Sequence, residues 1–130
     1  MLRTIAAALL AAHGLIHLIG FVVPWGIAQV EGFPYRTSAL AGAIALGEPG
    51  ARLVGVAWLV LAAGFVVAGV ATWRRAAWAA PLTAALAVGS IVVCALGLPE
   101  AMFGIVVNMA ILAALGWVAD VRGSTVRVAG

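Results

Sequence analysis

The sequence predicts an all-α integral membrane protein, a bundle of four transmembrane helices with a long outer loop between the first and the second helix. Composition is the first observation behind this prediction: 66% of the 130 residues are hydrophobic, 8% are charged and the mean hydropathy is +1.24. Soluble domains carry about 25% charged residues. The second observation is that apolar stretches, each near the roughly 20 residues that a bilayer requires, fill nearly the whole chain. We therefore expect one integral membrane domain over residues 1–130.

The first predicted helix covers residues 4–24, an apolar run interrupted by His13 and His17. A secretory signal peptide is the alternative for such a run near the N-terminus, with a small-residue cleavage position near Ala28. The length of the run and the pair of histidines favour a membrane span instead.

The outer loop is expected over residues 31–51, because glycines and prolines gather near both of its ends. These residues are Gly32, Pro34, Gly47, Pro49 and Gly50. The middle of the loop, Ser38 to Leu46, offers a helix N-cap followed by an apolar turn or two, which is too short to cross a bilayer. We expect this part to lie in the outer membrane interface or to fold onto the bundle as a lid.

Short turns separate the other three predicted helices, which cover residues 52–73, 76–98 and 100–120. Arg74 and Arg75, with a tryptophan close to each side, predict a tight turn at the level of the lipid headgroups. Pro99 and Glu100 predict the next turn. An acidic residue in the first turn of the last helix also interacts favourably with the positive end of the helix dipole.

The arginines predict the orientation in the membrane. With this threading, one side carries Arg3, Arg74, Arg75, Arg122 and Arg127, and the other carries Arg36 and Arg52 together with Glu31, Glu48 and Glu100. By the positive-inside rule, both termini are expected in the cytoplasm. The net charge of +3 comes from scattered arginines with no basic run that follows phosphates, so we expect the lipid bilayer as a partner and no nucleic acid.

Polar and small residues are expected to face the inside of the bundle. At about 100° per residue, His13 and His17 share one face of the first helix, and bulky aliphatic residues occupy the opposite face. Counting from the middle of each helix places His17, together with Trp58, Ser90 and Asn108, roughly 3 to 7 Å from the membrane midplane towards its outer side. The sequence thus predicts one polar layer to which all four helices contribute.

Two further polar residues are expected outside this layer. Thr83 lies about 6 Å towards the cytoplasm, where its hydroxyl is expected to bond back to its own helix. Glu100 lies about 10 Å further out than the layer, at the outer rim of the bundle, and is a poor direct partner for either histidine.

The chain resembles a family of small bacterial membrane proteins with four helices and no assigned function. The resemblance rests on the run His13-Gly14-Leu15-Ile16-His17-Leu18-Ile19-Gly20-Phe21, on Gly55, Trp58-Leu59, Ala62-Ala63, Phe65 and Ser90, and on Glu100-Ala101, Phe103-Gly104 and Asn108. The family pattern has tryptophan, aspartate, lysine and glutamine where this chain has Leu98, Glu100, Met102 and Ile91. The resemblance implies a four-helix fold in a bacterial cytoplasmic (inner) membrane and supplies no activity or cofactor.

The residue types leave several functions open for His13 and His17. A structural or accessory role is the first, because a neutral imidazole offers one donor and one acceptor that Asn108, Ser90 or Trp58 can satisfy across helices. The second is a proton-coupled transporter or a protein that binds a small lipophilic ligand such as a quinone, because ionisable residues inside a membrane indicate function. A homodimer or a partner membrane subunit is compatible with either role.

Metal binding and catalysis are less favoured. Histidines at i and i+4 can hold one ion together, but a stable zinc site needs three or four ligands, and the layer offers no further histidine, aspartate or glutamate. Ser90 has no acidic residue in its layer to orient a histidine base, so we expect no enzyme of the hydrolase type. Cys94, the single cysteine, is expected to be a small buried residue.

Overall fold

The computed structural model describes residues 1–128 and is almost entirely helical. The helices are α1 (Leu2–His17), α2 (Ile19–Val22), α3 (Gly47–Trp73), α4 (Ala79–Leu96) and α5 (Met102–Val128), and the strands are β1 (Ser38–Ala39) and β2 (Ile44–Ala45). Four segments are long and apolar enough to cross a membrane: Leu2–Val22, Gly47–Trp73, Ala79–Leu96 and Met102–Val121. These findings confirm the all-α class and indicate a multi-pass membrane protein.

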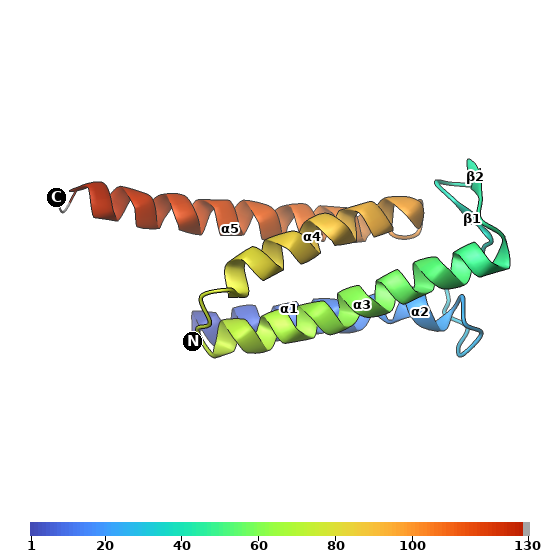
Figure 1. Ribbon diagram of the computed structural model, residues 1–130, viewed down its shortest axis with the longest axis horizontal. Coiled ribbons are helices and arrows are strands. Elements are labelled where there is room, and N and C mark those ends of the chain that lie inside the picture. Colours follow the sequence, from blue (N-terminus) through green and yellow to red (C-terminus); the bar gives the residue numbers. More distant parts are fainter. Residues whose placement is uncertain (129–130) are drawn as a thin grey trace.

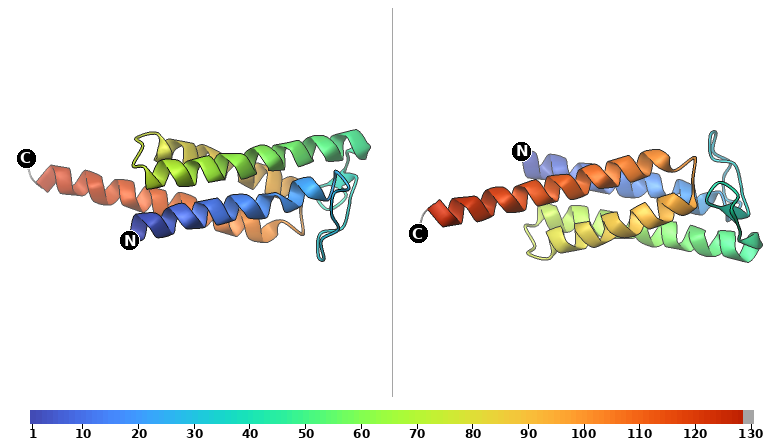
Figure 2. Two further views of the ribbon diagram at one scale, coloured as in Figure 1. Left: turned by 90° about the horizontal axis from the view of Figure 1, so that it is seen from below. Right: turned by 90° about the horizontal axis from the view of Figure 1, so that it is seen from above.

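The helices are arranged as two pairs (Figure 1). Helices α1 and α3 run side by side in opposite directions, α4 and α5 form the second pair, and α3 also packs against α4. The N-terminus and the turn between α3 and α4 lie at the end towards which α5 runs. At the other end lies the connection from α2 to α3. Figure 2 shows α5 continuing past the ends of the other helices at the N-terminal end.

Small residues bring α1 and α3 close together. A Cβ atom at Gly14 would lie 2.7 Å from the carbonyl oxygen of Ala62, and one at Gly69 would lie 2.7 Å from that of Ala7. Helices in lipid associate through such close packing, because lipid tails are as apolar as the side chains themselves. The glycines therefore fix α1 against α3 along most of its length.

A second close contact fixes α5 against α4. A Cβ atom at Gly104 would lie 2.6 Å from Cys94 Sγ. Cys94 is 1% exposed and packs with Trp58 and Ala101, which confirms the prediction that it is a small buried residue. The two pairs of helices contact each other through α3 and α4.

The connection between α2 and α3 differs in two ways from the expected loop. Ser38 to Leu46 contains the antiparallel strands β1 and β2 in place of the expected helical turns. Helix α3 begins at Gly47, inside the segment 31–51 that was assigned to the loop. Pro49 is compatible with this start because it falls in the first turn of the helix, where a missing backbone N–H costs nothing.

The tip of this connection is bonded to the end of α4. The backbone N–H groups of Leu40 and Ala41 donate to the carbonyls of Leu96 and Leu98, at 3.1 and 3.2 Å. Carbonyls at the end of a helix have no partner within it. The hairpin of β1 and β2 supplies a partner to one such carbonyl, that of Leu96, and to the carbonyl of Leu98 just beyond the helix, and it lies on the end of the bundle.

Candidate functional site

Four polar side chains from three helices meet inside the bundle, and we call them the polar cluster: His13 and His17 from α1, Ser90 from α4 and Asn108 from α5. All four are buried, with exposed fractions of 9% for His13, 3% for His17 and 0% for the other two. The histidines lie one turn apart on the face of α1 that looks inward. The structure therefore brings these four residues together as the helical faces predicted, but the hydrogen bonds come from three helices, and Trp58, the expected contribution of the second predicted helix, adds a ring contact with His17.

The donor and the acceptor of each hydrogen bond in the polar cluster can be assigned. The assignment starts from the backbone carbonyls, which can only accept. The carbonyl of His13 accepts from His17 Nδ1–H at 2.9 Å, so Nε2 of the neutral His17 ring carries no proton. The Ser90 hydroxyl therefore donates to His17 Nε2, at 2.7 Å. One turn further along α4, Cys94 Sγ lies 3.8 Å from Ser90 Oγ, and the thiol is the donor in this contact because the hydroxyl hydrogen is already used.

The orientation of the Asn108 amide follows in the same way. Its Nδ2 lies 2.7 Å from the carbonyl of Gly104 and 2.8 Å from Ser90 Oγ, and it donates one hydrogen to each. Its Oδ1 therefore accepts from His13 Nε2–H at 3.3 Å. Every N–H and O–H group of the polar cluster is engaged in a hydrogen bond.

One acceptor of the polar cluster remains open. With Nε2 of His13 protonated, Nδ1 is an acceptor, and no residue that the structure describes forms a hydrogen bond with it. His13 keeps 9% of its surface exposed, so the residue is not completely enclosed by the bundle.

Two aromatic residues of α3 pack against the histidines. Phe65 is fully buried and meets the His13 ring edge-on, with the ring centres 4.7 Å apart. Trp58 meets the His17 ring at 5.2 Å, so it contacts the polar cluster through its ring. The sequence analysis named Phe65 only among the residues of the family resemblance and did not select it as a site residue. Its position two turns after Trp58 was the available signal.

Thr83 and Glu100 lie apart from the polar cluster. The Thr83 hydroxyl donates to the carbonyl of Ala79 in the same helix at 2.8 Å, which confirms the expected bond. Glu100 forms an ion pair with Arg36 at 2.7 Å. This pair joins the connection between α2 and α3 to the segment just before α5, and the sequence analysis did not foresee it.

A cavity of about 100 Å³ lies beside this ion pair. Arg36 and Glu100 line it, and so does Trp58, which also contacts His17. Most of the other lining residues are apolar, and they come from α2, α3, the end of α4 and the segments that connect these helices. The indole of Trp58 thus links the cavity to the polar cluster.

Residues 1–128 contain no group of three or more histidine, cysteine, aspartate or glutamate side chains placed to hold a metal ion. Comparison of the chain with protein-family models, with curated proteins and with solved structures gives no match. A function is therefore inferred from the geometry of the polar cluster.

Proposed function

We propose that the protein binds a small lipophilic molecule at the polar cluster, as a multi-pass protein of the bacterial cytoplasmic membrane. Both termini lie in the cytoplasm in this proposal, and the connection between α2 and α3 forms an outer loop. The arginine distribution supports this orientation. It agrees with the positions of the N-terminus, the turn between α3 and α4 and the far end of α5 at one end of the bundle (Figure 1).

The open acceptor on His13 Nδ1 is the observation that carries the proposal. Since every donor of the polar cluster is already engaged, a ligand must supply the hydrogen for the bond. A hydroxyl group does so, and a carbonyl group does not. The ligand class is therefore a lipophilic alcohol, phenol or quinol, and the reduced form of a quinone is favoured over the oxidised form.

The same hydrogen bonds argue against a proton relay through the polar cluster. A relay passes protons through groups that both accept and release them, as hydroxyl and imidazole groups do. Asn108 interrupts such a path, because its amide does not readily exchange a proton between Oδ1 and Nδ2. This geometry supports ligand binding over proton-coupled transport.

A structural role is compatible with this proposal. The bonds His13–Asn108 and His17–Ser90 join α1 to α5 and α4, helices that have far less backbone contact with α1 than α3 has. Interhelical hydrogen bonds in membranes contribute about 0.6 to 2 kcal/mol each. The polar cluster thus holds the two pairs of helices together and also presents an acceptor.

The test uses the purified protein in lipid nanodiscs with a short-tailed benzoquinol and the same compound in its oxidised form. Native mass spectrometry and equilibrium dialysis measure binding of each form. We expect the quinol to bind about tenfold more tightly than the quinone, since one additional hydrogen bond contributes about 1.4 kcal/mol. Equal binding of the two forms, or no binding of either, contradicts the proposal.

Three variants make this test specific. His13→Phe keeps a ring against Phe65 and removes the acceptor, so quinol selectivity should disappear. Asn108→Leu frees His13 Nε2–H to donate, so binding of the quinone should rise relative to that of the quinol. Thr83→Val is the matched control, because it removes a buried hydroxyl that bonds only within its own helix.

A further inference from the structure

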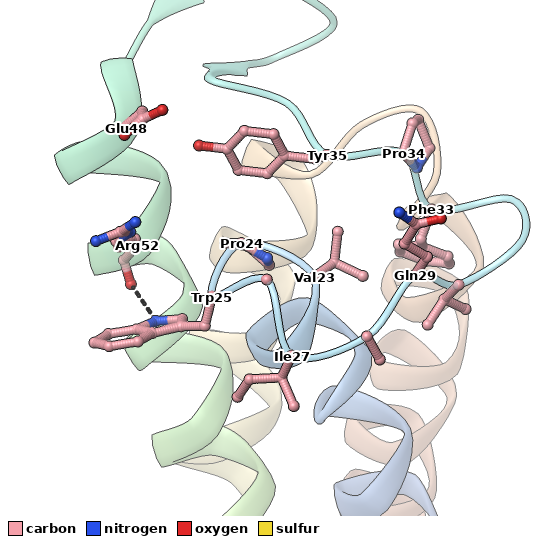
Figure 3. Close-up of a pocket in the computed structure, with 13 residues that line it drawn as sticks. Val23, Pro24, Trp25, Ile27, Gln29, Phe33, Pro34, Tyr35, Glu48 and Arg52 are labelled. Atoms are coloured by element: carbon pink, nitrogen blue, oxygen red, sulfur yellow. Dashed lines mark hydrogen bonds between the residues drawn. The ribbon is translucent and has the colours of Figure 1, made fainter.

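A second pocket lies at the end of the bundle opposite to the N-terminus, away from the polar cluster. Its volume is about 700 Å³, within the roughly 300 to 1,000 Å³ typical of small-molecule sites. The chain from Val23 to Tyr35 forms one wall, and the first turns of α3 form the other (Figure 3). None of the residues of the polar cluster lines this pocket.

The α3 wall presents one negative and one positive side chain, Glu48 and Arg52, one helical turn apart. Both are exposed, and no described residue forms an ion pair with either of them. Figure 3 shows the hydroxyl of Tyr35 pointing across the pocket towards this part of α3. The pocket therefore offers an anion, a cation and a neutral hydrogen-bond donor side by side.

The rest of the pocket is suited to the membrane interface. Trp25 and Tyr35 are 44% and 48% exposed, and such aromatic side chains concentrate at the level of the lipid headgroups. The candidate span Leu2–Val22 ends just before the pocket, and the span Gly47–Trp73 begins beside it. A ligand held between Glu48 and Arg52 thus lies where the apolar part of the bundle ends.

We propose that this pocket binds the zwitterionic headgroup of a phospholipid of the phosphoethanolamine type. Arg52 and the Tyr35 hydroxyl donate to the phosphate, and Glu48 accepts from the ammonium group. A headgroup with a phosphate and no cation leaves Glu48 unpaired beside a second negative charge, so it binds less well. This site is independent of the polar cluster, and either can fail without the other.

The Arg52 side chain can be replaced without loss of the local fold. The hydrogen bond that holds Trp25 against α3 runs from the indole N–H to the backbone carbonyl of Arg52, at 3.2 Å. A substitution at position 52 leaves this carbonyl in place. Arg74→Gln removes a positive charge at the other end of α3 and is the matched control.

The experiment is native mass spectrometry of the full-length protein titrated with phosphatidylethanolamine and phosphatidylglycerol of identical acyl chains. The wild type and the Arg74→Gln control should bind phosphatidylethanolamine about tenfold more tightly than phosphatidylglycerol. Arg52→Gln should weaken binding of phosphatidylethanolamine at least about tenfold, which matches the loss of a charge-assisted hydrogen bond. Glu48→Gln should raise binding of phosphatidylglycerol and remove the selectivity.

Three results would overturn the proposal. Equal affinity for the two lipids in the wild type excludes recognition of a zwitterion. Equal losses in Arg52→Gln and in Arg74→Gln exclude this pocket as the site. Full competition by soluble phosphoethanolamine, without any preference between the two lipids, reassigns the pocket to a free zwitterion.

Discussion

Asn108 Nδ2 and Ser90 Oγ lie 2.8 Å apart on the neighbouring helices α5 and α4, and each of these side chains also binds a histidine of α1. Asn108 accepts from His13, and Ser90 donates to His17. The two histidines therefore bind to a pair of residues that is itself joined by a hydrogen bond, which makes the polar cluster a shared element of three helices.

Ser90→Ala is expected to destabilise the protein by about 1 to 2 kcal/mol, because it leaves His17 Nε2 and one N–H of Asn108 without partners. Thermal unfolding in detergent, followed by circular dichroism, measures the effect. Thr83→Val is the control, and its effect should be smaller, because the carbonyl of Ala79 keeps its helical partner. Equal losses in the two variants would show that the bonds between helices carry no additional stability.

Gly14→Ala is expected to separate α1 from α3 and to cost roughly 1 to 3 kcal/mol. The added methyl group would lie 2.7 Å from the carbonyl oxygen of Ala62 and 2.9 Å from Phe65 Cβ, and backbone atoms cannot move aside without shifting a helix. Gly116→Ala is the control, since a Cβ atom there meets nothing within 4 Å. The thermal unfolding midpoint of Gly14→Ala should lie below that of Gly116→Ala. Similar midpoints would contradict the close packing of α1 against α3.

Arg36→Gln is expected to change global stability by less than about 1 kcal/mol, because Arg36 is 45% exposed and exposed ion pairs contribute little. Its effect should be local. Hydrogen exchange, read by mass spectrometry, should become faster in residues 33–39, which the ion pair with Glu100 joins to the segment before α5. Unchanged exchange in this segment would show that the hairpin contacts with α4 alone hold it.

The proposed orientation predicts which side of the membrane reacts with an impermeant thiol reagent. In a Cys94→Ala background, Glu31→Cys should be labelled from outside intact cells, and Arg74→Cys should be labelled only after the membrane is opened. Both positions are exposed and lie at opposite ends of the bundle. The reverse labelling pattern would invert the topology and leave the polar cluster unchanged.

The four spans and the inner faces of the helices could be predicted from the sequence, because apolar length and helical periodicity determine both. Ser90 and Asn108 each lie on a face rich in small residues, and so do His13 and His17. A polar side chain in a membrane helix turns away from lipid. The inward position of these four side chains follows from these two local rules, whereas the choice of Asn108 for His13 and of Ser90 for His17 depends on how the helices pack.

The features that depend on tertiary contacts could not be predicted. Leu40 and Ala41 have positive φ values of 50° and 55°, which residues other than glycine rarely adopt. Their N–H groups donate to carbonyls at and just beyond the end of α4. Arg36 and Glu100 are 64 positions apart in the sequence and meet only after the bundle has formed. Neither contact leaves a periodic signal in the sequence.

The division of the polar cluster between helices bears on the order in which the protein assembles. The bond from Asn108 to Ser90 lies within the hairpin of α4 and α5, and the bond from His17 to His13 lies within α1. In lipid, each part can therefore cover some of its own polar groups, and the bonds from His13 to Asn108 and from His17 to Ser90 require both parts. A helix in the wrong register would leave these groups without hydrogen-bond partners in hydrocarbon, which is energetically unfavourable. The polar cluster therefore favours one register of the helices.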